Sequence, residues 1–435
     1  MLGQRHVIRC FPRSHRRLLV GRGQRRNTSN FNVVEHVVKA QHTRDRAAGT
    51  LGSRDTLRLH VNQYIPKGDA SSRRDEGVTI IGAHANGFPK EMCEPFWDDL
   101  EDCMRAQGCS IRSIWIADIA SQGQSGILNE AVLGPEPSWL DHARDLLFLI
   151  NQFQEEMPHP IIGIGNSVGA SHLAHLALLH PRLLHGLILV DPILQTSLLP
   201  HKQFARLSTL RRDTWPSRAA AAAKFRSNSY YQSWDPRVLD KWLAFGLRDV
   251  DQGPAGNSAD GPPVTLSTTV AQEVYFYLRP KYFEERLLQD DRPPDDHHSE
   301  DMDGLPFWRP EMDQLYRQLP EIKPSTLYVF GKESPASPPE YRKAKMDLTG
   351  SGNDGNGGVA AGRVEEVVLN CGHLVGMERP RECAEVCSRF IDREMTRWEG
   401  QERRRAEVAR KLTREERVGI NDLWKRNLGV EDRRK

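Results

Sequence analysis

The sequence lacks the features that define several large classes of protein. No apolar run approaches the roughly 18 residues that a membrane-spanning helix needs, so we expect no transmembrane segment. No phosphate-binding P-loop, no dinucleotide fingerprint after the first strand and no basic patch with interleaved aromatics is present. The net charge of +2 provides no global field for an anionic partner. These absences argue against nucleotide cofactors and nucleic-acid binding.

Cysteine is also sparse. The 435 residues contain seven cysteines, an odd number without a C-x-x-C pair, which suits a reducing compartment better than a disulfide framework. Cys383 and Cys387 lie four residues apart on an expected helix, but no histidine pair at the spacing of a zinc site accompanies them. The acidic stretch 295–301 is interpreted as a solvated surface loop. We therefore expect neither a metal ion nor another cofactor.

The first 34 residues contain no acidic residue. Eight arginines precede Glu35, which is the composition of a mitochondrial presequence, and a disordered basic tail is the equal alternative. Residues 431–435 do not form a Ser-Lys-Leu type of peroxisomal address. We expect an intracellular protein in a reducing compartment, and the mitochondrial, peroxisomal and cytoplasmic alternatives stay open.

Apolar, strand-like segments alternate with helix-like segments through most of the chain. Strands are predicted at 31–39, 57–65, 78–83, 111–117, 160–164, 186–190, 326–330 and 364–369. Amphipathic helices are predicted at 96–107 and 139–153. This alternation indicates an α/β fold with a doubly wound, mostly parallel sheet that is covered on both faces.

The strand pattern stops between residues 191 and 324. Helical segments are predicted there at 202–212, 217–227, 236–245 and 268–278, separated by stretches rich in Gly, Pro and Asp. We predict a helical cap with flexible loops at 193–323, inserted after the sixth strand, where α/β sheets bind ligands. The predicted core comprises 31–192 and 324–395, residues 1–30 form a basic disordered or targeting extension, and 396–435 form a charged helical tail.

The segment Gly165-Asn166-Ser167-Val168-Gly169 lies between an apolar strand and an expected helix. This pattern is typical of a nucleophile elbow, in which a strained turn exposes the serine and small flanking residues let the strand and helix approach. An ordinary strand-to-helix turn with a capping serine is the alternative. We predict that Ser167 is a nucleophile.

A catalytic serine needs a histidine to take its proton and a carboxylate to orient that histidine. His373 follows the last expected strand in a Gly-His pair, and we predict that it is the base. The usual acid position after the penultimate strand holds Ser334, with Glu333 one residue earlier. Asp191 occupies the other known acid position, at the end of the strand after the elbow helix. We favour Asp191 as the acid and keep Glu333 as the alternative.

An acyl-transfer site also needs two backbone N–H donors for the oxyanion. Val168, directly after the expected nucleophile, supplies one of them. The second is predicted to come from Asn86 or a neighbour in the loop 84–88. His84 is expected to be a structural hydrogen-bonding residue of that loop.

Together these motifs resemble the α/β-hydrolase superfamily. The resemblance is carried by residues 84–89, by the elbow, by Leu189-Val190-Asp191-Pro192 and by Gly372-His373. Segments 31–36, 95–100 and 141–145 are similar to a fungal branch that includes toxin-biosynthesis hydrolases and a yeast peroxisomal lipase. The resemblance covers about residues 31–393. Ser334, in place of the expected acid, departs from the family pattern.

Two functional hypotheses follow. The resemblance implies a serine hydrolase that cleaves an ester or thioester, of a lipid acyl or secondary-metabolite substrate, through an acyl-enzyme intermediate. The alternative is a non-catalytic α/β-hydrolase scaffold that binds a ligand or partner, which gains weight if no carboxylate reaches His373. The substrate and the oligomeric state stay open.

Overall fold

The computed structural model describes residues 25–68, 77–197, 199–250, 261–280 and 307–430. Four predicted segments lie outside the described residues. They are the basic extension up to residue 24, the cap loops at 251–260 and 289–304, and the last five residues of the tail.

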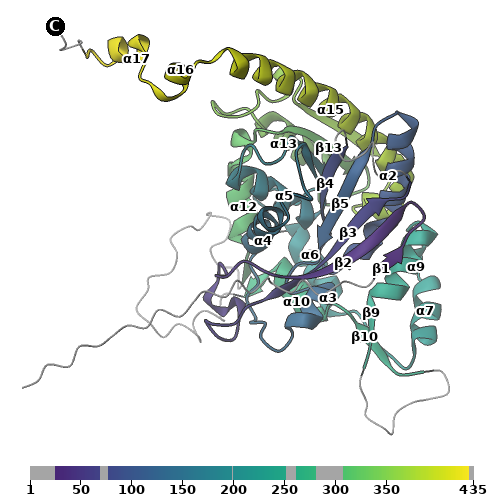
Figure 1. Ribbon diagram of the computed structural model, residues 1–435. Coiled ribbons are helices and arrows are strands. Elements are labelled where there is room, and N and C mark those ends of the chain that lie inside the picture. The colour runs from purple at the N-terminus through teal and green to yellow at the C-terminus, as the bar shows by residue number, and fades with distance from the viewer. Residues whose placement is uncertain (1–24, 69–76, 198, 251–260, 281–306, 431–435) are drawn as a thin grey trace, which may run out of the picture.

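A nine-stranded sheet runs through the middle of the molecule (Figure 1). Its order is β1-β2-β3-β5-β4-β6-β7-β13-β14. The strands are β1 Arg25–Asn27, β2 Phe31–Lys39, β3 Arg58–Pro66, β4 Val78–Ala83, β5 Ile111–Ala117, β6 Ile161–Asn166, β7 Gly186–Val190, β13 Ser325–Gly331 and β14 Val364–Leu369. Pairing is antiparallel from β1 to β5 and parallel from β5 to β14. The predicted mostly parallel α/β sheet is confirmed, with β1 as an additional edge strand.

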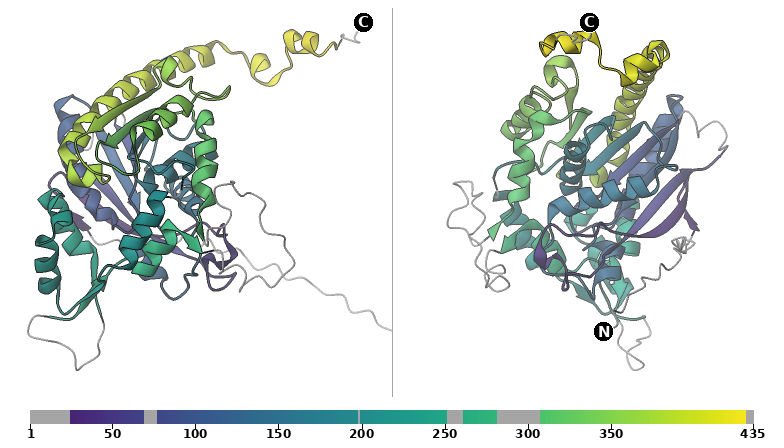
Figure 2. Two further views of the ribbon diagram at one scale, coloured as in Figure 1. Left: turned by 180° about the vertical axis from the view of Figure 1, so that it is seen from behind. Right: turned by 60° about the vertical axis from the view of Figure 1, so that its left-hand side comes forward.

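Helices cover both faces of this sheet because its central strands are apolar on both sides (Figures 1 and 2). On one face lie α4 (Trp139–Gln152) and α5 (Val168–Leu179), whose Leu149 and Leu173 join one buried cluster. On the other lie α2 (Glu94–Ala106) and α15 (Pro380–Lys411), whose Trp97 and Phe390 join a second cluster. The two clusters hold the helices against the parallel strands, whose carboxyl ends all lie at the same edge of the sheet.

A helical insert follows β7, which is the sixth predicted strand because β1 precedes the predicted set. We call the described residues between β7 and β13 the insert. Its helices are α6 Leu199–Thr209, α7 Arg218–Arg226, α8 Ser229–Gln232, α9 Pro236–Phe245, α10 Val270–Tyr277 and α12 Pro310–Arg317. It also contains short strands that were not predicted: β8 Thr214–Trp215, β9 Leu247–Asp249, β10 Val264–Leu266, β11 Arg279–Pro280 and β12 Phe307–Trp308. The helices α6 and α10 matter most for the site.

The C-terminal part of the chain is one long helix followed by two short ones. Helix α15 continues across residue 396, and the last buried side chain on it is that of Glu394. Beyond the body of the molecule, α16 (Arg414–Val418) and α17 (Asp422–Asn427) have no buried residue (Figure 1). Of the helices in the described ranges, none combines the length and apolar character needed to cross a membrane.

Candidate active site

Ser167 lies at the sharp turn between β6 and α5. Its φ of 56° and ψ of −121° are strained for a residue with a side chain. A Cβ atom on Gly165 would lie 2.5 Å from the carbonyl oxygen of Gly169, and one on Gly169 would lie 2.2 Å from that of Ala83. Both positions therefore require glycine, and the close approach of strand and helix keeps the Ser167 hydroxyl above the sheet.

His373 and Asp191 form a hydrogen-bonded series with Ser167. Nε2 of His373 lies 2.8 Å from Oγ of Ser167, and Nδ1 lies 2.5 Å from Oδ2 of Asp191. The Asp191 carboxylate is fully buried, whereas the His373 side chain is 15% exposed. Because Nδ1 faces a carboxylate, we assign the proton to Nδ1, which leaves Nε2 free to accept the serine proton.

The alternative acid, Glu333, is not brought to His373. Its side chain is exposed, and its backbone N–H donates to the carbonyl oxygen of Cys371 at 3.0 Å. Within the described ranges, the only carboxylate hydrogen-bonded to the His373 ring is that of Asp191.

Ser334 is a member of this group that the sequence reasoning missed. Its hydroxyl donates to Oδ2 of Asp191, the same oxygen that faces His373, and lies 3.4 Å from Nδ1 of His373. The N–H of Ala336 donates to Ser334 Oγ at 3.2 Å, and the N–H of Gly331 donates to Oδ1 of Asp191 at 3.2 Å. The sequence showed a serine in the usual acid position, but it did not show that this serine contacts Asp191.

The loop after β4 supplies the other side of the site. His84 accepts the N–H of Ile119 at Nε2, at 3.0 Å, so its Nδ1–H donates to the Ala85 carbonyl at 2.9 Å. This is the structural role expected for His84. In the described part of the chain, the backbone N–H groups of Asn86 and Val168 donate to no other protein atom. Both are therefore free to bind an oxyanion.

An aromatic residue of the insert covers the His373 ring. Phe204 on α6 stacks on the His373 ring, with a centroid distance of 5.6 Å and an interplanar angle of 20°. Nothing in the local sequence around Phe204 indicated this contact, because the two residues are 169 positions apart. The insert therefore contributes directly to the walls of the site.

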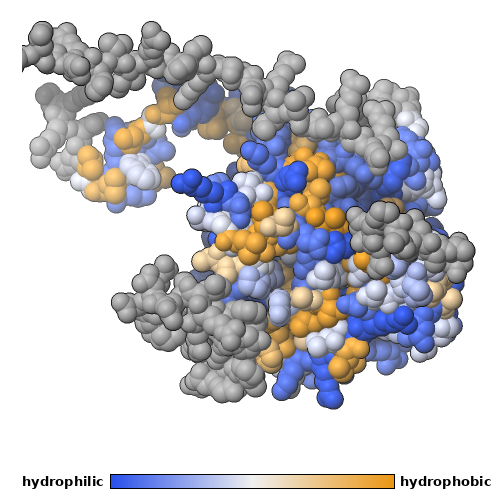
Figure 3. Space-filling view, turned by 90° about the horizontal axis from the view of Figure 1, so that it is seen from below, coloured by the Kyte–Doolittle hydropathy of each residue, from blue (hydrophilic) through white to orange (hydrophobic). Residues whose placement is uncertain are grey.

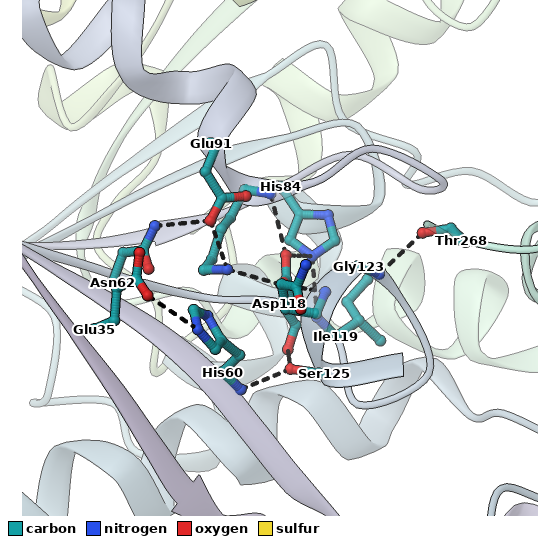
Figure 4. Close-up of polar contacts among 12 residues, drawn as sticks. Glu35, His60, Asn62, His84, Glu91, Asp118, Ile119, Gly123, Ser125 and Thr268 are labelled. Atoms are coloured by element: carbon teal, nitrogen blue, oxygen red, sulfur yellow. Dashed lines mark hydrogen bonds and ion pairs between the residues drawn. The ribbon is translucent and has the colours of Figure 1, made fainter. Parts of the chain in front are cut away.

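A buried ionic cluster is formed by Lys90, Glu91 and Asp118. It lies beside His84 of the loop 84–88, and Figure 4 shows Glu91 and Asp118 near that histidine. Lys90 Nζ lies 2.8 Å from a carboxylate oxygen of both Glu91 and Asp118. Burial alone would lower the pKa of Lys90, but the two carboxylates outweigh it and raise the value. Burial likewise opposes ionisation of Glu91, yet the charge of Lys90 lowers its pKa to about 2. Asp118 also accepts the backbone N–H groups of Lys90 and Gln124, so the cluster fixes the chain on both sides.

Comparison with known proteins places these residues in a family context. The model of the Alpha/beta hydrolase family matches residues 83–386. The type I acyl-CoA thioesterase mpaH' of Penicillium brevicompactum is 38% identical over 403 residues, covering 87% of this chain and 91% of the relative. The abhydrolase domain-containing protein ACTT2-2 of Alternaria alternata is 28% identical, covering 62% of this chain and 97% of the relative.

The fold has a counterpart among solved structures. The peroxisomal alpha-beta-hydrolase Lpx1 of Saccharomyces cerevisiae has a TM-score of 0.64 at 18% identity, covering 92% of this chain and 98% of that chain. At that identity, the likeness establishes the shared fold alone.

Proposed function

We propose that this chain, which belongs to the alpha/beta hydrolase family, is a thioesterase whose nucleophile is Ser167 and whose substrates are acyl-CoA thioesters. That it is a hydrolase of esters or thioesters follows from its family and its thioesterase relatives. The observation that carries the residue assignment is the continuous series from Ser167 Oγ through His373 to Asp191. The choice of thioester rests on the relative that is 38% identical over most of both chains.

In the proposed acylation step, Ser167 Oγ attacks the thioester carbonyl carbon while His373 Nε2 takes the hydroxyl proton. The negative charge of Asp191 stabilises the imidazolium that forms. The carbonyl oxygen becomes an oxyanion, which the N–H groups of Val168 and Asn86 stabilise. When the tetrahedral intermediate collapses, the C–S bond breaks, His373 protonates the leaving sulfur, and an acyl-serine and a free thiol result.

In the proposed deacylation step, His373 removes a proton from a water molecule that attacks the acyl-serine. The intermediate collapses with return of the proton to Ser167 Oγ, and a carboxylic acid leaves. Phe204 covers one face of the imidazole, and Leu207 and Leu210, on and just after the same helix α6, are exposed apolar residues that suit a substrate with an apolar acyl group. Apolar side chains also gather in the middle of the face seen in Figure 3.

The scaffold hypothesis loses its basis in this geometry. It required that no carboxylate reach His373, whereas Asp191 Oδ2 lies 2.5 Å from Nδ1. Ligand binding alone does not require a strained serine whose hydroxyl lies 2.8 Å from an imidazole.

Two measurements test the proposal. Release of free thiol from a series of acyl-CoA thioesters is compared with cleavage of p-nitrophenyl esters of the same acyl groups, and a fluorophosphonate probe titrates the reactive serine. We expect labelling and preferred thioester cleavage, and a fall in kcat on the order of 10⁴- to 10⁶-fold for Ser167→Ala. A folded protein that resists the probe would refute the nucleophile. Labelling with cleavage of esters alone would refute only the thioester assignment.

We also propose a reducing, intracellular location. The described cysteines, Cys93, Cys103, Cys109, Cys371, Cys383 and Cys387, are all free. A fluorescent protein fused to the C-terminus of the full chain, with and without residues 1–24, reports the compartment, and secretion would contradict the proposal.

A further inference from the structure

The oxyanion loop is held on its core side by one buried amide. Nε2 of Gln122 donates to Oδ1 of Asn86 at 2.6 Å, and Oε1 of Gln122 accepts the N–H of Gly87 at 2.8 Å. Gln122 precedes α3 (Gly123–Asn129) and has no exposed surface. The two bonds fix the Asn86 side chain and the next peptide group together, so they set the plane of the backbone at Asn86.

The same loop is held on its other side by the insert. Nδ2 of Asn86 donates to the backbone carbonyl of Glu273 on α10 at 3.0 Å. Gly87, with a φ of +83°, lies so close to α10 that a Cβ atom there would be 2.8 Å from the Glu273 carboxyl carbon. The side chain of Asn86 therefore joins the core to the insert, at the same residue whose backbone N–H is free.

Glu273 is in turn tied to the helix that covers His373. The Ser208 hydroxyl on α6 donates to Oε1 of Glu273 at 2.6 Å, and Arg211 forms an ion pair with the other oxygen. The Glu273 side chain is buried, and burial raises the pKa of its carboxyl group while the Arg211 charge opposes the rise. Because α6 also carries Phe204, this helix contacts both the base and, through Glu273, the oxyanion loop.

We propose that Asn86, Gln122 and Glu273 are positioning residues that couple the insert helices α6 and α10 to the oxyanion hole. The proposal rests on the proposed function, because it requires that the Asn86 N–H bind an oxyanion. None of the three side chains touches the reacting atoms; they act by orienting one peptide group. The contact of α10 with Asn86 is therefore part of what holds this N–H group in place.

The coupling predicts a particular kinetic signature. An oxyanion donor acts mainly in the transition state, so tilting it lowers kcat more than it raises KM. Losing one such donor costs about 10²- to 10³-fold, and misaligning it costs part of that. Asn86→Ala keeps the N–H but removes the side-chain bonds to Gln122 and to the Glu273 carbonyl, together with a contact to Tyr277 on α10. We expect its kcat to fall about 10- to 100-fold, with KM changed less than about threefold.

Two isosteric variants separate the core tie from the insert tie. Asn86→Asp keeps an acceptor for Gln122 but loses the donor to the Glu273 carbonyl. Gln122→Glu keeps an acceptor for the Gly87 N–H but loses the donor to Asn86. We expect both variants to lower kcat. We also expect the double variant Gln122→Glu with Asn86→Ala to be no slower than Asn86→Ala alone, because both changes break the same hydrogen bond between Gln122 and Asn86.

Glu273→Gln tests whether the insert itself takes part. It keeps the Ser208 bond but loses the ion pair with Arg211, and we expect a fall in kcat of about 3- to 10-fold. Gln203→Ala, an exposed amide on α6, is the matched control and leaves kcat unchanged. All rates are taken with p-nitrophenyl butyrate and divided by the fluorophosphonate-titrated site concentration, so unfolded protein does not count.

The outcomes distinguish this proposal from the function beneath it. If the probe does not label the folded wild-type protein, the assignment of Ser167 as the nucleophile is refuted, and the proposed function fails before the coupling is tested. With labelled wild type, the coupling is overturned if Asn86→Ala and Gln122→Glu keep their kcat within twofold per titrated site, or if only KM changes. If the variants lose folded protein but keep an unchanged kcat per titrated site, the three residues have a structural role alone. That result would also overturn the proposed coupling.

Discussion

Two carboxylates at the same edge of the sheet are used in opposite ways. Asp191 follows β7 on one side of the elbow strand β6, and Asp118 follows β5 on the other side. Asp118 is paired directly with the ammonium group of buried Lys90. The direct partners of Asp191 are neutral groups: the hydroxyl of Ser334, a backbone N–H and the imidazole of His373.

The difference shows how a buried charge is kept available for chemistry. The charge of Asp118 is compensated permanently, so it fixes structure. The charge of Asp191 is stabilised by hydrogen bonds, and in the proposed mechanism it stays available to the imidazolium that forms during the reaction. Breaking the first arrangement should cost folding, and breaking the second should cost turnover.

The largest expected effect comes from Asp191→Asn. The amide is nearly isosteric but favours the wrong tautomer of His373, so we expect kcat to fall about 10⁴-fold while the fold is retained. Glu333→Gln is the matched control and should leave turnover within twofold. Steady-state kinetics and far-UV circular dichroism check both variants. An equal loss in the two variants would contradict the assignment of Asp191.

Lys90→Met should show the reverse pattern. It leaves the charge of Asp118 buried without its ammonium partner and leaves Glu91 with only the more distant Arg26, 3.9 Å away. Losing one partner of a buried pair costs about 3–5 kcal/mol. We expect the free energy of unfolding in urea to fall by that amount, whereas Lys224→Met on the exposed face of α7 changes little. A stable Lys90→Met protein with a large loss of kcat per titrated site would show that the Lys90–Asp118 pair supports turnover rather than folding, and would contradict the contrast with Asp191.

The buried histidines behind His84 predict a pH dependence of stability. Within the described residues, none of the four ring nitrogens of His142 and His172 has a hydrogen-bond partner, and burial lowers the pKa of both well below its usual value. The unfolded chain binds these protons near pH 6.5 and the folded protein does not, so stability is fully present above pH 6.5 and is lost as the pH falls below it.

Urea unfolding at pH 7.5, 6.5 and 5.5 measures this effect. Each of the two histidines should add a slope of up to about 1.4 kcal/mol per pH unit. His172→Leu should reduce the slope, and His180→Asn, an exposed position, should not. A slope that does not change in His172→Leu would mean that other groups carry the acid sensitivity.

Of the changes around Asp191 and Asp118, the smallest effect is expected for Ser334→Ala. It removes one hydrogen bond from Asp191 and none from Ser167, so we expect kcat to fall about five- to tenfold, since a hydrogen bond to a charged group is worth about 1.5–3 kcal/mol and water replaces part of it. Ser337→Ala, whose hydroxyl has no partner in the described part of the chain, is the matched control. Equal kinetics for the two variants would remove Ser334 from the group that supports His373.

The order of strands and the position of Ser167 could be predicted because their causes are local. Apolar runs such as 78–83 predict a buried parallel strand wherever they lie, and Gly165 and Gly169 are required by the backbone of the elbow itself. His373 was also predictable, from its place directly after the last strand. The unpredicted strands β8, β9 and β10 are only two or three residues long, too short to show a period.

Whether Asp191 or Glu333 lies beside His373 was decided by the tertiary structure. Glu333 directly precedes the usual acid position. The sequence alone cannot say that its side chain turns to solvent while Asp191, 182 residues before His373, lies beside that histidine. The contacts of Ser334, Phe204, Gln122 and Glu273 were invisible for the same reason. Local backbone rules act over a few residues, whereas these contacts depend on how distant segments pack over one edge of the sheet.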